Sequence, residues 1–338
     1  MKLVAVLHCY PPQHNAGAEW AVHTLLRGLV GAGHSADVVL TSQPGAEYEL
    51  DGVSVHPFVH KSDPGKYCQQ ADVVLTHLEN TPRATAIARI LKLPVVHVLH
   101  NTFDPSKKWI VPDVGLAVYN SEWMRRDYQK FFDFHGDPKV PSVVVNPPVL
   151  AEDYRTKPGT KVTLINMTEA KGALVFWELA EAMPDVEFLA VVGGYGEQIL
   201  AHPKGLELPN VTIHPHTPGH DMKTVYGQTR VLLMPSEYES WGRVGVEAFA
   251  SGIPVIAHPT PGLTESLGSA GVFLDRSHVL SWEHRLRELL DGRKWKRFSR
   301  EAKARSVELD PAPQIQSFVT AMEVLHARHA RKRGSPPP

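Results

Sequence analysis

The chain has 338 residues, 43% of them hydrophobic, with 35 Lys and Arg against 36 Asp and Glu. This length exceeds that of a usual single domain, so we expect two domains with substantial cores. The balanced charge argues against nucleic acid as the default partner, although it does not exclude a local basic patch.

The cysteines and the apolar runs bear on the location of the protein. Cys9 and Cys68 are far apart and form no CxxC pair, which argues against a disulfide framework and favours a reducing cytoplasm. No apolar run reaches the roughly 18 residues of a membrane span. Residues 3–7 are too short for a signal-peptide core and are typical of a buried strand. We therefore expect a cytoplasmic protein without integral membrane association.

Short apolar runs alternate with amphipathic stretches along nearly the whole chain. In the first half, the runs that predict strands are residues 3–7, 37–40, 73–76, 95–99, 114–119 and 142–145. In the second half, they are residues 163–166, 187–192, 211–215, 231–234 and 254–257. Helical patterns fall between them, for example at residues 19–31, 83–91, 173–182, 222–228 and 245–250. Continuous Val, Ile and Leu runs separated by helices are typical of parallel α/β sheets.

The alternation stops once, at residues 146–160, where three prolines and a glycine predict a linker between domains. We therefore predict one Rossmann-like domain over residues 1–150 and a second over residues 151–310, facing each other across a cleft. A helix at residues 311–330 is expected to cross back to the first domain, and residues 331–338 are expected to form a disordered tail.

Two glycine-bearing loops follow predicted strands. The loop at residues 8–20 contains Gly17 and leads into a helix, which is the arrangement that receives phosphate. It lacks the GxGxxG pattern and the spaced acidic residue, so we predict no dinucleotide cofactor. An ordinary turn with one glycine is the alternative. Gly193, Gly194 and Gly196 leave the same two interpretations open, a close approach of a ligand or a plain turn.

The segment at residues 231–267 carries the strongest signal. A buried strand is followed by a loop that presents Glu239 and contains Gly242. A helix then starts near Arg243 and carries Glu247. Free N–H groups at a helix start attract the diphosphate of a nucleotide sugar. Glu247 is then placed for ribose hydroxyls and Glu239 for sugar hydroxyls, whereas two surface glutamates without a role are the plain alternative.

This segment resembles the donor-binding signature of retaining glycosyltransferases of family four, which have the GT-B fold and the pattern E-x7-E, here Glu239 and Glu247. Further pieces of the family's pattern occur in order along the chain: Gly17-Ala18-Glu19, residues 94–101 with His100, Asn120-Ser121-Glu122, Lys171-Gly172, Gly193 to Gly196, and Ser236. The resemblance covers about the first 310 residues and is specific mainly at residues 239–265.

By this resemblance the protein is a metal-independent, retaining hexosyl- or pentosyltransferase that uses a nucleotide-diphosphate sugar and no cofactor. Glu239 would contact the transferred sugar, Lys171 would neutralise charge on the leaving diphosphate, and His100 would lie beside the sugar. The resemblance assigns donor binding to Gly17, Lys171, Gly194, Glu239, Ser240, Trp241, Gly242, Arg243, Val244 and Glu247. It implies a front-face route in which the leaving phosphate helps to deprotonate the acceptor, so no general base is assigned.

One departure from the family concerns the diphosphate. The family often has an arginine five residues before the lysine of the KG pair, and this chain has Asn166 there. Diphosphate binding would then rest on Lys171, the helix start and Arg243. An Arg243 that faces the acceptor or the solvent stays an open alternative.

The histidines and one basic stretch each allow a functional and a purely structural interpretation. No HExxH, DxD or Cys/His quartet accompanies the 19 histidines, so we predict no metal site, even at the pair His214 and His216. The basic, aromatic-bearing residues 107–109 and 125–132 predict contact with a membrane surface or an anionic acceptor, or else a solvated helix face.

The acceptor is not identified by the sequence, which leaves a glycan, a lipid, a protein, a small molecule or a modified nucleic acid open. Two other functions fit the same donor site. One is a nucleotide-sugar epimerase of the same fold, and the other is a catalytically silent sensor or scaffold that binds the nucleotide sugar.

Overall fold

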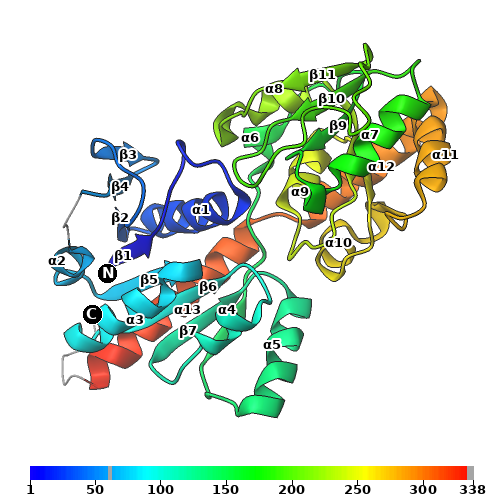
Figure 1. The fold of residues 1–338 in the computed structure, drawn as a ribbon. Helices are drawn as coiled ribbons and strands as arrows, with labels where there is room; N and C mark the ends of the chain where they lie inside the picture. The colour runs from blue at the N-terminus through cyan, green and yellow to red at the C-terminus, as the bar shows by residue number, and fades with distance from the viewer. Residues whose placement is uncertain (60–62, 333–338) are drawn as a thin grey trace. The chain divides into compact units, whose positions relative to one another are not determined.

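The computed structural model describes residues 1–59 and 63–332 and divides into two compact units (Figure 1). The N-terminal unit comprises Met1–Tyr10, Ala18–Pro148 and the chain from Pro311 onwards. The C-terminal unit comprises Val149–Asp310 together with Pro11–Gly17. The predicted linker at residues 146–160 therefore contains the passage from one unit to the other. Of the predicted tail, residues 333–338 lie outside the described part of the chain.

The N-terminal unit is built on an eight-stranded sheet with the order β3-β4-β2-β1-β5-β6-β7-β8. Neighbouring strands are parallel except β3 and β4. The strands β4-β2-β1-β5-β6-β7 follow the 3-2-1-4-5-6 order of a Rossmann fold. The bounds of the strands are β1 (Lys2–Leu7), β2 (Ser35–Leu40), β3 (Tyr48–Leu50), β4 (Val53–His56), β5 (Val73–His77), β6 (Val95–Leu99), β7 (Val114–Tyr119) and β8 (Ser142–Val144).

Helices cover both faces of this sheet because successive side chains of its buried strands point to opposite faces. Leu3, Ala5 and Leu7 of β1 belong to the core formed with α1 and α13, whereas Val4 and Val6 belong to the core formed with α2 and α3. The helices of this unit are α1 (Gly17–Gly31), α2 (Pro64–Cys68), η1 (Leu78–Asn80), α3 (Thr81–Leu91), α4 (Asp104–Lys108), α5 (Glu122–His135) and α13 (Ala312–Lys332).

The C-terminal unit repeats the same strand order in a six-stranded sheet, β11-β10-β9-β12-β13-β14. All of its neighbouring strands are parallel. The bounds are β9 (Lys161–Ile165), β10 (Phe188–Val191), β11 (Val211–His214), β12 (Thr229–Met234), β13 (Val255–Ala257) and β14 (Val272–Phe273).

Two hydrophobic cores lie on the two faces of this second sheet. Residues of α7 and α11 pack in one core, and residues of α6, α8, α9 and α10 pack in the other. The helices are α6 (Ala151–Tyr154), η2 (Glu169–Lys171), α7 (Ala173–Ala182), η3 (Gly219–Asp221), α8 (Met222–Tyr226), α9 (Arg243–Ala250), α10 (Pro261–Leu267), η4 (Gly268–Ala270), α11 (Val279–Leu290) and α12 (Gly292–Glu308).

Every strand predicted from the apolar runs overlaps a strand of the structure. The prediction lacks β3, β4 and β14, which are two to four residues long and too short for a period to be recognised. The helix predicted at residues 311–330 corresponds to α13, which packs in the core of the N-terminal unit through Phe318, Val319 and Met322. Among the described residues, no helix has the length and apolarity to cross a membrane.

Candidate functional site

The strand order of the C-terminal sheet reverses between β9 and β12, which are neighbours in the sheet but are separated in sequence. In doubly wound sheets the crevice for ligands opens at the carboxyl ends of the strands at this switch point. The two loops that leave these strands are joined, because the Glu237 backbone N–H donates to the Ala170 carbonyl at 2.9 Å. The predicted KG pair and the predicted E-x7-E segment therefore lie side by side.

Lys171 and Glu239 form an ion pair across these two loops. The Lys171 Nζ lies 2.5 Å from Glu239 Oε1, and the Ser236 hydroxyl donates to the same oxygen at 3.0 Å. The two charged side chains are 20% and 14% exposed, so both remain accessible to a ligand. Burial alone lowers the pKa of the Lys171 ammonium, but Glu239 and Tyr195 outweigh burial and raise the pKa above its ordinary range. Lys171 is therefore a cation at any physiological pH.

Glycines start the helices that follow both strands of the switch point. Gly172 precedes α7 with a φ of 93°, and Gly242 precedes α9 with a φ of 78°. A Cβ on Gly172 would lie 2.3 Å from Cγ of Pro235, and one on Gly242 would lie 2.3 Å from Cδ2 of Leu263. No side chain of the described residues caps either helix start. The Ala173 N–H of α7 donates to the Thr168 carbonyl at 3.1 Å and the Gly245 N–H of α9 to the Gly242 carbonyl at 3.0 Å. What the two helix starts offer an anion is therefore the positive end of the helix dipole rather than a full set of free amides.

Glu247 belongs to a cluster of four buried polar side chains. Its Oε1 accepts from Arg243 Nε at 2.8 Å, and its Oε2 accepts from the Tyr226 hydroxyl at 2.7 Å. The Arg243 guanidinium also donates to the Tyr154 hydroxyl at 2.8 Å. Burial lowers the pKa of Arg243, but the neighbouring Tyr154 and Glu247 raise it above its usual value. Glu247 and Arg243 therefore form a compensated pair inside the unit.

Asn166 stands where the resembled family often has an arginine. It has a φ of 71°, a conformation in which asparagine is enriched, and it is buried. The Gln198 side chain donates to Asn166 Oδ1 at 2.8 Å and accepts from the backbone N–H groups of Met167 and Gly193 at 2.9 and 2.8 Å. A Cβ on Gly193 would lie 2.3 Å from Asn166 Cγ. Asn166 thus packs the ends of β9 and β10 together.

The other predicted donor residues lie at the first loop, in the core of the C-terminal unit and at the start of α9. Gly194 lies against the first loop, since a Cβ on it would be 2.5 Å from the Asn15 carbonyl oxygen. A Cβ on Gly17 would meet only ordinary contacts, at 3.9 Å from Arg243 Cβ. Trp241 is buried in the core with α9 and α10, and Ser240 and Val244 flank the glycine at the helix start. Their contacts with a donor stay predictions.

In the N-terminal unit, His100 follows β6 and lies in a group of imidazoles and carboxylates. His100 Nε2 and His77 Nδ1 are 3.1 Å apart, and the rings of His77 and His8 have centroids 5.4 Å apart. His8 in turn lies 3.2 Å from the Glu19 carboxylate and 3.7 Å from that of Glu79. Burial first, and then His8, lowers the pKa of His100 to about 3, so this ring is neutral.

Sequence reasoning singled out only His100 of this group as a site residue. His8 and His77 also stand at strand ends of the same sheet, immediately after β1 and at the end of β5. Burial, and then Glu79, raises the pKa of Glu19 to about 7. The signal that could have found the group is the position of His8, His77 and His100 at the carboxyl ends of three adjacent strands, which meet at one edge.

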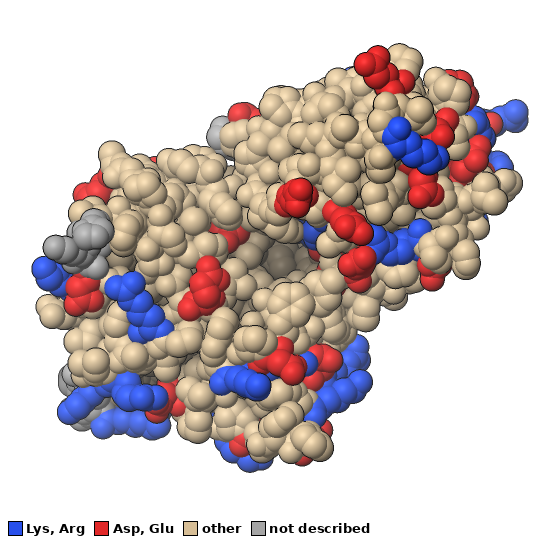
Figure 2. Space-filling view, viewed as in Figure 1, with Lys and Arg blue, Asp and Glu red and all other residues tan. Residues whose placement is uncertain are grey.

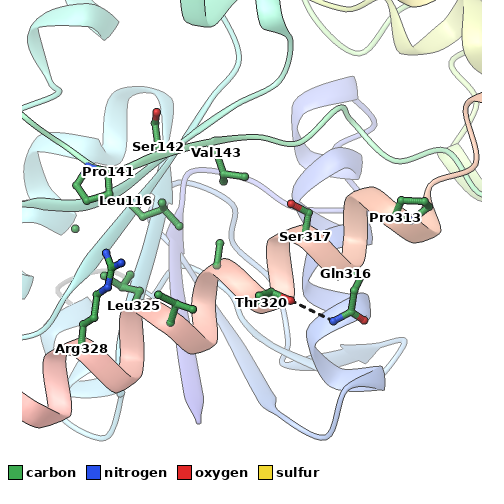
Figure 3. A pocket seen from close by; sticks show the side chains of 13 residues that line it. Leu116, Pro141, Ser142, Val143, Pro313, Gln316, Ser317, Thr320, Leu325 and Arg328 are labelled. Atoms are coloured by element: carbon green, nitrogen blue, oxygen red, sulfur yellow. Dashed lines mark hydrogen bonds between the residues drawn. The ribbon is translucent and has the colours of Figure 1, made fainter.

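A groove of about 850 Å³ lies elsewhere in the N-terminal unit, between α13 and the strands β7 and β8 (Figure 3). Its lining is mostly apolar and small, and Arg328 is its only charged residue among those described. Among the described residues, this lining contains no Asp, Glu, His or Lys to activate its hydroxyl groups, so we place no reaction there.

The fold is that of GT-B glycosyltransferases. Sucrose-phosphate synthase of Thermosynechococcus elongatus superimposes with a TM-score of 0.74 at 13% identity, over 97% of this chain and 100% of that one. HepE of Anabaena in complex with UDP-glucose gives a TM-score of 0.76 at 17% identity, over 96% and 100% of the two chains. The trehalose-6-phosphate synthase OtsA gives 0.73 at 11% identity, over 96% and 99%. Identities this low establish the architecture alone.

The sequence of the C-terminal unit also matches glycosyltransferases. Residues 157–305 match the family model described as Glycosyl transferases group 1. A D-inositol 3-phosphate glycosyltransferase of Mycobacterium sp. (strain KMS) is 36% identical over 121 residues, 33% of this chain and 27% of that protein. The enzyme of the same name from Mycolicibacterium smegmatis is 31% identical over 166 residues, 45% and 38% of the two chains. The chain thus spans between about a quarter and two fifths of these relatives. The predicted resemblance to glycosyltransferases is confirmed for residues 157–305.

Proposed function

We propose that this protein is a retaining glycosyltransferase that moves a hexosyl or pentosyl group from a nucleotide-diphosphate sugar to an acceptor hydroxyl. One observation carries the proposal: the Lys171–Glu239 pair lies beside two helix starts without side-chain caps, at the switch point of the sheet. Positive helix ends and an ammonium attract a diphosphate, and a neighbouring carboxylate accepts hydrogen bonds from sugar hydroxyls. The match of this unit to group 1 glycosyl transferases supports the same activity.

The reaction follows from the roles of these two residues. In the free protein Lys171 and Glu239 neutralise each other at 2.5 Å. A bound diphosphate draws the ammonium towards itself, which frees Glu239 to accept from the sugar. As the bond between the anomeric carbon and the phosphate oxygen breaks, Lys171 and the α7 and α9 amides stabilise the growing negative charge. The acceptor oxygen bonds to the anomeric carbon on the same face, and its proton passes to the leaving diphosphate oxygen.

Arg243 is better explained as a positioning residue than as a phosphate ligand. Its guanidinium is buried and is engaged by Glu247 and Tyr154. An arginine in that place fixes the orientation of the Glu247 carboxylate, the group we propose for the ribose hydroxyls. We further propose that the diphosphate is neutralised without a metal, because the ammonium of Lys171 and the helix amides already supply the positive charge.

A thermal-shift screen against nucleoside diphosphates tests donor binding. Since the neighbour HepE was solved with UDP-glucose, UDP is the first probe and GDP and ADP are the comparison. We expect one diphosphate to raise the melting temperature, and we expect Glu247→Ala to reduce this shift. Glu283→Ala, on α11, is the matched control and leaves the shift unchanged. A flat response to every diphosphate contradicts the proposal.

Transfer itself is tested with the donor that the screen selects. Retention is read from the anomeric proton coupling of the product by NMR, and an inverted product contradicts it. Isomerisation of the donor without an acceptor identifies an epimerase instead. Tight binding without turnover of any donor identifies a sensor or scaffold.

A further inference from the structure

Arg276 follows β14 in the C-terminal unit, and the main chain around it is held on both sides. The Arg276 backbone N–H donates to His258 Nδ1 at 3.2 Å, and the indole N–H of Trp282 donates to the Asp275 carbonyl at 2.8 Å. Trp282 is fully buried in the core that also contains α7. The side chain of Arg276 therefore starts from a fixed point at the carboxyl edge of the sheet.

The guanidinium of Arg276 reaches both loops at the switch point of this sheet. It donates to the Glu169 carbonyl at 3.1 Å, after β9, and it pairs with the Glu237 carboxylate at 2.5 Å, after β12. Lys171 lies two residues after Glu169, and Glu239 lies two residues after Glu237. One side chain thus ties together the loops that carry the two charged residues proposed for the donor.

An ordinary surface ion pair is the alternative explanation for this arginine. Asp and Glu side chains lie next to Lys and Arg side chains on the visible surface of both units (Figure 2). Exposed pairs of this kind contribute little, because solvent and salt screen them. Arg276 differs from them in two ways, since its side chain is only 19% exposed and it also donates to a main-chain carbonyl of a second loop.

The bridge matters most when a donor is bound. In the free protein Lys171 and Glu239 also link the two loops, through their own ion pair at 2.5 Å. In the proposed reaction the diphosphate draws the Lys171 ammonium towards itself, so this link opens at the stage when Lys171 has to be in place. Two links do not involve that pair: the backbone hydrogen bond from Glu237 to Ala170, and the bridge made by Arg276.

We propose that Arg276 is a positioning residue of the donor site, which holds the Lys171 loop against the Glu239 loop while the bond between sugar and diphosphate breaks. The inference rests on the proposed glycosyltransferase function. The negative charge on the leaving diphosphate grows along the reaction, so a displaced ammonium stabilises the transition state less and lowers the rate more than it lowers binding. Arg276 thus acts through Lys171 and not on the donor itself.

Steady-state kinetics of Arg276→Gln, in the full chain and with the donor selected by thermal shift, test this role. Glutamine is shorter and uncharged, so it keeps neither the ion pair nor the bridge. We expect kcat to fall at least about tenfold while KM for the donor changes less than about threefold, because small misplacements of a reacting group cost rate steeply. Arg287→Gln is the matched control. Arg287, on α11 of the same unit, also pairs with two carboxylates, those of Asp185 and Glu283, and its variant keeps the full rate.

A double-mutant cycle with Lys171→Ala separates positioning from a general disturbance of the unit. If Arg276 acts by holding Lys171 in place, Arg276→Gln lowers kcat at most about twofold further once the lysine side chain is gone. A general disturbance lowers kcat by the same factor in both backgrounds. Glu237→Gln removes the other end of the bridge from a side chain that is 59% exposed, and we expect it to lower kcat in the same direction. The test therefore does not depend on the folding of one variant.

Three results would overturn the inference. They are an unchanged kcat in Arg276→Gln, an equal loss of kcat from this substitution in the Lys171→Ala background, and a rise of KM for the donor without a loss of kcat. Absence of donor binding, or of any transfer by the unchanged protein, is a different result, because it contradicts the proposed function itself.

Discussion

The two units share one strand order and differ in what they place at its switch point. In the C-terminal unit, glycines start the two flanking helices, no described side chain caps them, and Lys171 stands beside them. In the N-terminal unit, histidines and glutamates occupy the same topological place. The comparison teaches that the sheet fixes where a ligand binds, whereas the loop residues fix its charge.

The difference also extends to how each unit handles buried charge. Burial raises the pKa of Glu247, and the Arg243 guanidinium at 2.8 Å and the Tyr226 hydroxyl oppose this rise. Glu19 lies 3.2 Å from the imidazole of His8, and burial raises its pKa to about 7. The buried acid of the C-terminal unit thus has a buried arginine beside it, whereas that of the N-terminal unit lies beside a histidine and takes up a proton near neutrality. The following experiments test this difference between the two units.

The largest effect is expected at the compensated pair. Arg243→Met leaves Glu247 as a buried carboxylate without its cation, and breaking a buried ion pair costs about 3–5 kcal/mol. We expect the free energy of unfolding of the C-terminal unit to fall by that amount, as followed by hydrogen exchange of α9 peptides in urea. Tyr154→Phe removes one hydrogen bond to the same guanidinium and should cost about 2 kcal/mol. Equal losses for both variants would refute the assigned role of the ion pair.

The next effect is on catalysis at the C-terminal switch point. Lys171→Ala removes the cation that we propose for the leaving diphosphate, and loss of one such group lowers kcat by about 10²–10³-fold. The initial rate at saturating donor measures it. Lys204→Ala, at an exposed lysine of the same unit that pairs with Glu181, is expected to keep the full rate. A fully active Lys171→Ala enzyme would remove this residue from the mechanism.

A smaller effect concerns pH and the N-terminal unit. The pKa of Glu19 is about 7 in the folded protein against an ordinary value of 4.5, so the folded state binds more protons between these values. Stability therefore falls as the pH rises from about 4.5 to about 7, by about 3 kcal/mol in total. Urea unfolding of the N-terminal unit at several pH values measures this slope. Glu19→Gln should flatten it, and an unchanged slope would show that another group titrates.

The smallest effect is expected from metal removal. If Lys171 and the helix amides neutralise the diphosphate, the transfer rate stays the same after dialysis against EDTA. Dialysis without chelator is the control. A loss of rate that Mn²⁺ or Mg²⁺ restores would mean that the charge balance of the donor site includes an ion.

Much of the fold could be predicted because buried parallel strands are short, continuous apolar runs. The predicted strands all have counterparts, and the pause at residues 146–160 marks the passage between the units. The hairpin of β3 and β4 could not be predicted, because its strands are three and four residues long and half polar. Patterns of this length do not distinguish a strand from a loop.

The candidate site was predictable in part. The order of Lys171, Glu239 and Glu247 along the chain indicated one donor region, but not that Lys171 would pair with Glu239 while Glu247 would pair with Arg243. Which carboxylate pairs with which cation depends on where the loop ends and α9 begins. It also depends on the buried hydroxyls of Tyr154 and Tyr226, which come from distant segments. Trp241 is buried in the core of the C-terminal unit, which the sequence did not indicate, and its predicted contact with the donor stays a prediction.

The last helix has a consequence for how the protein is made. Phe318, Val319 and Met322 of α13 complete the core that also contains Leu3, Ala5 and Leu7 of the first strand. The part of this core that α13 covers therefore stays exposed until residues 312–332 have been synthesised. The C-terminal unit, whose residues are nearly contiguous, has no such wait. The core of the N-terminal unit is thus complete only after all residues of the C-terminal unit have been synthesised.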